Sequence, residues 1–275
     1  MNTNIKFNKL LTLIHQQEAP EAIFLIATTS IQYNYSNLFF NVTESAKQPN
    51  AYLLLIIIDA DTKQCTQIQS KLETILQPVA PVTCWCMPLS SFNEALLQGS
   101  YFACKVFQQA ERLFMATDAE FAQPAATPFC NQYQQQWYQR ALEFYAGAEL
   151  FIIRKQYAMA AFHLHQCAEQ AFTSIVYNKS GYRPATHNLL LLLRYACWFE
   201  PLLYELFPPQ QLKEESLLHL LQQAYTRSRY TNDFSIKGKQ LARIGEQVEQ
   251  LLSLAKITGG NAATLHHSTL HAKQA

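Results

Sequence analysis

The sequence is poor in glycine, in net charge and in long apolar segments. Only 7 of its 275 residues are glycine, so we expect no glycine-rich phosphate loop. The formal net charge is +1, so no overall field draws the chain to nucleic acid or to an acidic surface, although a local basic patch remains compatible with it. The longest apolar run, residues 53–58, is far too short to cross a bilayer. We therefore expect no membrane partner.

Cysteine pairs with the spacing of a metal or thioredoxin-like motif are also missing. The seven cysteines are scattered, and no two of them form a CxxC pair. Cys84 and Cys86 flank Trp85 in an apolar run, where both thiols would share one face of a strand. Their spacing admits a metal or redox pair, but buried thiols are the favoured interpretation. Residues 1–17 are interrupted by polar side chains and lack the apolar core of a secretion signal, so we expect a reduced, cytoplasmic protein.

Residues 1–115 alternate between two kinds of pattern. Short continuous apolar runs predict strands, and apolar residues at helical spacing predict helices. The predicted strands are 22–28, 52–58 and 82–87, and the predicted helices are 5–17, 62–76 and 90–98, the last capped by Ser90 or Ser91. Runs that are apolar at every position indicate strands covered on both faces. The first domain is therefore predicted to be a small α/β domain.

The second part of the chain is helical in pattern. A linker is predicted at 116–130, where Pro124 and Pro128 interrupt any period. Apolar residues then recur at steps of three and four through 131–257, with a stop at Asn178–Gly181, which predicts an all-α antiparallel bundle of about five helices. The tail, 258–275, has no apolar period, and we expect it to be disordered. The fold class is thus α+β/α with two domains.

Three motifs in the helical part give a more specific indication. They are AAFHLHQCAEQA at Ala160–Ala171, Pro184 followed by Thr186–Leu189, and AYTRSRY at Ala224–Tyr230. In this order, with helices between them, they resemble the conserved segments of HEPN domains. The resemblance covers roughly residues 135–256, and it implies a helical domain that pairs as a homodimer and acts on or binds nucleotides or RNA.

HEPN domains are commonly paired with nucleotidyltransferases, so the resemblance also bears on the first domain. A minimal nucleotidyltransferase has Gly-Ser after its first strand and Asp-x-Asp at the start of the next, where the carboxylates hold a metal. Here the first strand ends Thr28-Thr29-Ser30, and the next opens Asn50-Ala51-Tyr52. The resemblance therefore implies a degenerate nucleotidyltransferase-like domain in 1–115 without transfer chemistry.

Asp59 and Asp61 form the one acidic pair beside a predicted strand. They follow residues 53–58, at the end of a strand where α/β folds often bind ligands. That is the wrong end of the strand for the nucleotidyltransferase motif. A solvated turn with a helix cap is the favoured interpretation, and a Mg²⁺ site is the alternative.

Arg227, Arg229 and Tyr230 are candidate ligand-binding residues of the helical domain. In HEPN ribonucleases an Arg, which steadies the phosphate, is followed roughly four to six residues later by a His that transfers a proton. After Arg229 no His occurs before His266. The resemblance thus implies lost cleavage, with arginines that still bind phosphate; exposed cations at a helix end are the alternative.

His165, Glu169 and His187 complete the candidate ligand site. His165 and Glu169 stand four residues apart, so they share a helix face and are predicted to pair, in a ligand pocket or as a structural contact. For His187, a hydrogen bond at the start of the next helix is favoured over catalysis.

Two functions from different classes follow. The first is a non-catalytic HEPN protein that binds a nucleotide, RNA or another phosphorylated ligand, with a toxin–antitoxin-like, defence or stress setting as its expected context. The alternative is an enzyme: a nucleotidyltransferase through Asp59 and Asp61, or a ribonuclease with a displaced His such as His165. No cofactor is required by the first, and Mg²⁺ belongs to the second.

Overall fold

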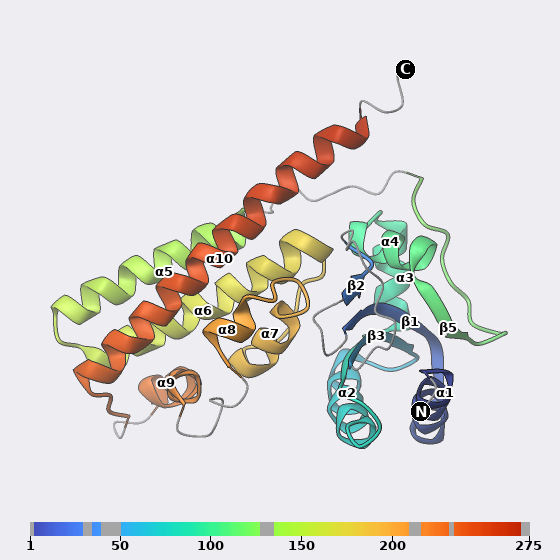
Figure 1. Ribbon diagram of the computed structural model, residues 1–275, viewed down its shortest axis with the longest axis horizontal. Coiled ribbons are helices and arrows are strands. Elements are labelled where there is room, and N and C mark those ends of the chain that lie inside the picture. Colours follow the sequence, from blue (N-terminus) through green and yellow to red (C-terminus); the bar gives the residue numbers. More distant parts are fainter. Residues whose placement is uncertain are drawn as a thin grey trace. The chain divides into compact units, whose positions relative to one another are not determined.

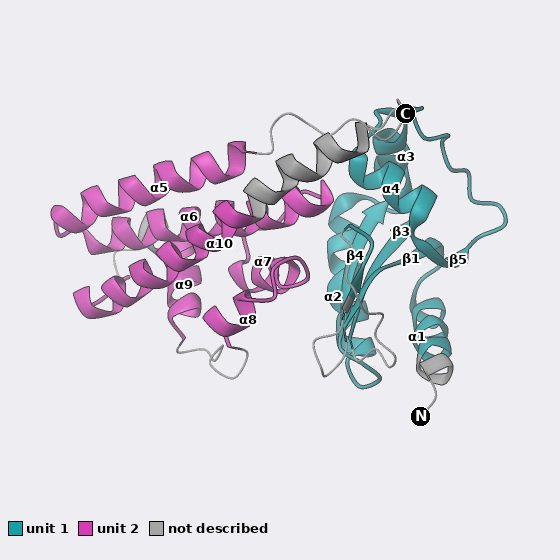
Figure 2. Cartoon of the chain, turned by 45° about the horizontal axis from the view of Figure 1, so that its top comes forward, with its two compact units in different colours: residues 1–131 teal, residues 132–275 magenta. Residues whose placement is uncertain are grey.

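The computed structural model describes residues 3–29, 35–39, 51–126, 135–208, 216–230 and 234–270. They form two compact units, Met1–Asn131 and Gln132–Ala275, which Figure 2 shows in different colours. The side chains of residues 3–6, 35, 228–230 and 258–270 lie outside the described set.

Unit 1 is built on a five-stranded sheet. Its strands are β1 (Pro20–Thr29), β2 (Tyr35–Asn37), β3 (Ala51–Ile58), β4 (Val82–Pro88) and β5 (Glu111–Met115). The order is β2-β1-β3-β4, and β5 also pairs with β1. β1 runs antiparallel to its three partners, whereas β3 and β4 are parallel. β2 pairs with residues 27–29 of β1 and β5 with residues 22–25, so the two short strands follow one another along β1.

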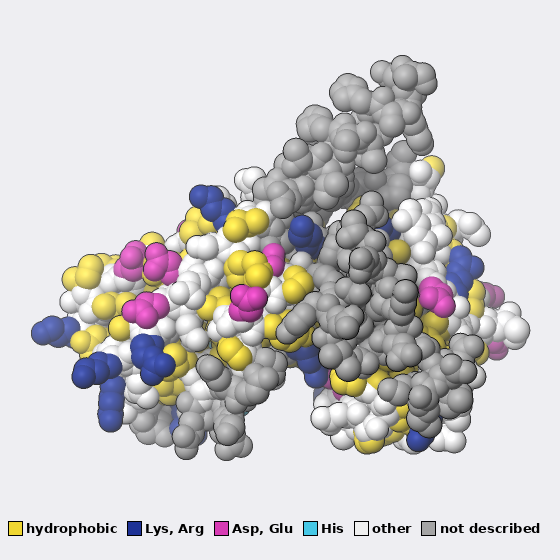
Figure 3. All heavy atoms as spheres, viewed as in Figure 1, with side chains coloured by type: hydrophobic (Ala, Val, Ile, Leu, Met, Phe, Trp, Pro, Cys, Tyr) yellow, Lys and Arg dark blue, Asp and Glu magenta, His cyan; other side chains and the backbone are white. Residues whose placement is uncertain are grey.

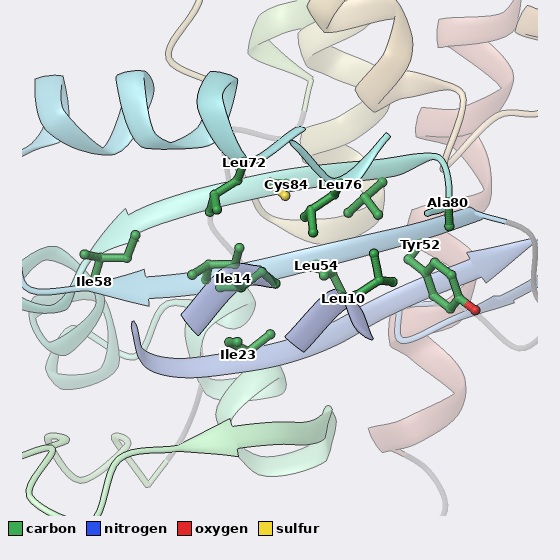
Figure 4. Close-up of a cluster of buried hydrophobic side chains, with 12 residues drawn as sticks. Leu10, Ile14, Ile23, Tyr52, Leu54, Ile58, Leu72, Leu76, Ala80 and Cys84 are labelled. Atoms are coloured by element: carbon green, nitrogen blue, oxygen red, sulfur yellow. The ribbon is translucent and has the colours of Figure 1, made fainter. Parts of the chain in front are cut away.

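Helices cover both faces of this sheet, as the apolar runs predicted. On one face, α1 (Thr3–Gln17) and α2 (Thr62–Leu76) bury a cluster that includes Leu10, Leu54 and Leu72, shown in Figure 4. On the other, the helices are α3 (Leu89–Leu97) and α4 (Tyr101–Gln109). Phe92 of α3 lies 6.1 Å from Phe24, and Phe102 of α4 lies 5.8 Å from Trp85, centroid to centroid.

The helix starts in unit 1 differ from one another. α2 begins where the sequence predicted it, because Asp61 and Gln64 form a capping box: Asp61 Oδ1 accepts from Gln64 N at 2.7 Å, and Gln64 Oε1 accepts from Asp61 N at 3.0 Å. The predicted cap of the next helix is wrong. α3 begins directly after β4, its N-cap is Pro88, and neither Ser90 nor Ser91 caps it, because both lie inside its first turn.

Unit 2 is an all-helical bundle (Figure 1). Its helices are α5 (Gln136–Ile153), α6 (Tyr157–Ser180), α7 (Leu189–Ala196), the short α8 (Leu203–Leu206), α9 (Leu217–Tyr230) and α10 (Gly238–Leu270). α6 is the central helix and packs against α5, α7, α9 and α10. It ends at Gly181, whose left-handed φ of 73° suits glycine.

α10 runs beyond the predicted end of the bundle. The sequence placed that end at residue 257, but the helix continues to Leu270. No proline follows Ile257 to stop it. Side chains after residue 257 lie outside the described set, so the expected disorder of the tail stays a prediction.

The contact between α5 and α6 depends on a glycine. A Cβ on Gly147 would collide with the ring of His163, which is the nearest side chain to it. His163 packs among the rings of Phe144, Phe151 and Phe162. Burial lowers the pKa of this imidazole, so it is held in its neutral form. His163 thus fills space between the two helices.

The variant Gly147→Ala tests this packing. We expect it to lower the free energy of unfolding by about 1–3 kcal/mol, because the added methyl group overpacks the contact with His163. Gly245→Ala is the matched control: nothing lies within 4 Å of its added Cβ, and Ala favours a helix over Gly by about 1 kcal/mol. Urea unfolding followed by circular dichroism measures both. Equal changes in the free energy of unfolding from the two substitutions would contradict the close contact between Gly147 and His163.

Candidate functional site

A buried carboxylate and an exposed imidazole meet where α6 faces the segment that leads into α7. His187 Nδ1 lies 3.0 Å from both Oε1 and Oε2 of Glu169. The Glu169 side chain is 9% exposed, whereas that of His187 is 64% exposed. Because a carboxylate accepts hydrogen bonds, Nδ1 is the donor, and Nε2 is the ring nitrogen that remains for another partner.

Other polar side chains of α6 lie close to the Glu169 carboxylate. Gln166 Nε2 lies 3.3 Å from Oε2, and Gln170 Nε2 lies 3.5 Å from Oε1. His165 Nδ1 is 4.0 Å from Oε2 and 3.2 Å from Gln166 Nε2. A buried carboxylate is tolerated when donors surround it. These contacts therefore fix Glu169, and Glu169 in turn fixes the His187 ring.

An aromatic ring from α9 completes the cluster. The Tyr225 ring is stacked with that of His165 at 4.7 Å and 22°, and with that of His187 at 5.3 Å and 20°. The start of α7 is tied to α9 by a hydrogen bond of 2.7 Å from Leu189 N to Gln222 Oε1. Glu169, His187, His165 and Tyr225 form what we call the imidazole cluster.

The structure brings three of the sequence-predicted residues together. His165, Glu169 and His187 all belong to the imidazole cluster, and His165 is fully buried. Tyr225 was not predicted as a site residue. The one signal for it was its place in the Ala224–Tyr230 motif, which drew attention to the arginines instead.

His187 makes a hydrogen bond directly before α7, to Glu169, but it is not the residue that caps this helix. Asn188 is the N-cap, and its Oδ1 accepts from Leu190 N at 3.0 Å and from Leu191 N at 3.1 Å. Asn188 therefore caps α7, and the adjacent His187 contacts Glu169 of α6.

Of the candidates Arg227, Arg229 and Tyr230, the structure describes the side chain of Arg227. Arg227 is an exposed residue of α9, two positions after Tyr225. Arg229 and Tyr230 belong to the same helix, but their side chains lie outside the described residues. Their binding role stays a prediction.

Asp59 and Asp61, the acidic pair of unit 1, have different surroundings. Asp61 caps α2, and Asp59 is exposed. Across the described part of the chain, no group of three or more His, Cys, Asp or Glu side chains is placed to hold a metal. Burial raises the pKa of the Cys86 and Cys167 thiols, which makes these groups poor nucleophiles and poor metal ligands.

Comparison with known proteins places the helical unit in a family. Residues 134–258 match the model of the HEPN domain. Unit 2 is a HEPN domain. The predicted resemblance is therefore confirmed, and the imidazole cluster lies wholly inside the HEPN domain. No significant match was found among curated proteins.

One similar solved structure is a nucleotidyltransferase-like protein from Exiguobacterium sibiricum 255-15. It aligns with 93% of this chain and 76% of its own, at 15% identity and a TM-score of 0.32. The α/β character of unit 1 follows from its own five-stranded sheet and the helices on both faces. Among the described helices, none is long and apolar enough to cross a membrane.

Asp61→Ala distinguishes a cap from a metal site. We expect it to lower the free energy of unfolding by about 1 kcal/mol, because the Gln64 amide loses its acceptor. Asp59→Ala, an exposed neighbour, is expected to change it by less than about 0.5 kcal/mol. Thermal unfolding with and without Mg²⁺ measures both. A Mg²⁺-dependent rise in Tm that either substitution abolishes would support the metal site instead.

Proposed function

We propose that this HEPN domain binds RNA or a nucleotide, without cleaving it, on the face formed by His187 and Tyr225. The observation that carries the proposal is the exposed His187 ring, held by the buried Glu169 and stacked on Tyr225. An imidazole whose orientation is fixed by a buried carboxylate is prepared for a ligand before the ligand arrives.

The chemistry of this face suits a nucleotide unit. His187 Nε2 offers a hydrogen bond to a phosphate or a base edge, and Tyr225 supports the His187 ring by stacking on it. Arg227 on the same helix adds a guanidinium group, which pairs well with phosphate. Position 229 follows Tyr225 by four residues, so it lies on the same helix face.

Several observations favour binding over cleavage. No His follows Arg229 at the spacing of HEPN ribonucleases. His165, which we considered as a displaced catalytic residue, is fully buried and cannot reach a phosphodiester. Nucleotidyl transfer through Asp61 is disfavoured because its carboxylate caps α2.

A second candidate function has one specific observation behind it. The contact between Glu169 and His187 is the arrangement in which a carboxylate orients an imidazole as a general base. If this chain cleaves RNA, His187 is the residue we expect to take the proton.

Association of two copies through the helical domain is part of the proposal. Support comes from exposed apolar side chains near the C-terminal end of α5, with Leu150 46% and Ile153 78% exposed. A toxin–antitoxin-like, defence or stress role is the setting we propose for such a protein, on the HEPN resemblance.

Fluorescence anisotropy with labelled single-stranded RNA, and calorimetry with nucleotides, test the proposed function. We expect His187→Gln to weaken binding by roughly 2- to 10-fold, the loss of one hydrogen bond, and Tyr225→Leu to weaken it as well, because the His187 ring loses the ring on which it is stacked. His219→Gln, a change on α9 at a residue whose recorded hydrogen bonds go to Ser216, serves as control and should bind normally.

The same RNA is also followed on a gel. Intact RNA after incubation with the wild type is the expected result. Products that disappear with His187→Gln would support the ribonuclease alternative. No binding of RNA or of any nucleotide at high protein concentration would refute the proposed function.

A further inference from the structure

Two arginines lie over one tryptophan near the start of the HEPN domain. The guanidinium carbon of Arg140, on α5, is 5.4 Å from the centroid of the Trp137 ring, and that of Arg183 is 4.7 Å away. Arg183 belongs to the connection between α6 and α7. Tyr177 of α6 meets the same indole at 6.4 Å and 63°. Three separate segments of the chain therefore bring these groups together.

Neither cation has an acidic partner in the part of the chain that the structure describes. Among the described residues, no carboxylate lies within 4.0 Å of either guanidinium group, and the carboxylates of the recorded ion pairs belong to Glu18 and Glu169. Glu143 stands three residues after Arg140 on α5, yet makes no ion pair with it. Both arginines are exposed, and a guanidinium group forms charge-assisted hydrogen bonds to phosphate.

The Trp137 indole holds both of these arginines, as the Phe107 ring holds Arg112 in unit 1. Figure 3 shows Lys and Arg side chains over the end of unit 2 where α10 begins, so positive charge alone is not specific. A guanidinium group stacked on an aromatic ring loses conformational freedom before binding, and its donors keep a fixed direction. Such a group forms charge-assisted hydrogen bonds to phosphate at a smaller entropic cost.

We propose that Arg140 and Arg183 form a phosphate clamp, held by Trp137, for the backbone of single-stranded RNA. The inference rests on the proposed function and extends its site. Arg183 stands four residues before His187 in the same connection. On α6, Tyr177 follows Glu169 by eight residues, a rise of about 12 Å. The phosphate clamp and the imidazole cluster are therefore about 12 Å apart along α6 and are joined by one connection of the chain.

The distance between the phosphate clamp and the imidazole cluster favours a polynucleotide over a mononucleotide as the ligand. Each group combines aromatic rings with a polar or cationic head, which is how single strands are bound: phosphates by cations and unpaired bases by stacking. A mononucleotide can bind at the phosphate clamp or at the imidazole cluster, whereas a strand with repeated phosphates can contact both. RNA is thus predicted to bind more tightly than any mononucleotide.

The experiment measures the salt dependence of RNA binding by anisotropy, with a labelled single strand of about ten nucleotides. For Arg140→Gln and Arg183→Gln we expect at least a tenfold loss of affinity, and a slope of log K against log salt shallower by about 0.7 for each arginine. Arg243→Gln removes the same charge from an exposed position on α10 and is expected to keep the wild-type slope. The affinities for AMP and ATP are measured as well, for comparison with that for RNA.

A second readout reports on the clamp directly. RNA should change the tryptophan emission of the wild type, and Trp137→Phe should abolish that change while the fold persists by circular dichroism. Arg183→Lys keeps the charge but loses the planar fork, so intermediate affinity is expected.

The outcomes separate this inference from the proposed function. If RNA binds and Tyr225→Leu weakens it, but both arginine variants match Arg243→Gln in slope, the clamp is refuted and the proposed function stands. Arginine-dependent binding of ATP with no tighter binding of RNA would overturn the assignment to a polynucleotide. Wild-type protein that binds neither would refute the proposed function itself.

Discussion

The HEPN domain depends on one carboxylate that is kept inside it. Glu169 lies on the central helix α6, and its side chain is 9% exposed. An isolated buried carboxylate would cost several kcal/mol, by order of magnitude, and the cost falls only where donors converge on it. Here the donors are two glutamine amides and the Nδ1 of an imidazole from outside the helix. Satisfying Glu169 thus requires the connection after α6 to return to that helix and to bring His187 with it.

This requirement links the packing of the bundle to its proposed ligand site. The connection that delivers His187 also carries Arg183 to Trp137, and Asn188 then starts α7 with its own cap. α9 supplies Tyr225 to the stack and Gln222 to the first amide of α7. One short segment therefore positions an imidazole, a guanidinium group and a helix start, while the glycine at the end of α6 allows the chain to turn back. The site is a consequence of how the helices are joined.

Sequence patterns predicted the elements that bury long apolar surfaces. The runs at β1, β3 and β4 and the period of α2 gave elements close to those of the structure, because burial on one or both faces constrains many consecutive residues. The sequence patterns did not predict β2, α4, α8 or β5. β2 and β5 are short strands on the edge of β1, and β5 begins with the exposed Glu111 and Arg112, so little apolar pattern marks it. For the site, helical spacing placed His165 beside Glu169, but the contacts of His187 and Tyr225 span 18 residues or more of sequence and depend on tertiary packing.

The central claim is that the ring of His187, fixed by Glu169, is the group that meets the ligand. Its most direct test is a long-range ¹H–¹⁵N NMR spectrum of the histidine rings, recorded while unlabelled single-stranded RNA is added. The account predicts that the Nε2 signal of His187 shifts in proportion to bound RNA, while the signals of His163, packed between α5 and α6, stay in place. RNA that binds while the His187 signals remain unmoved would contradict it.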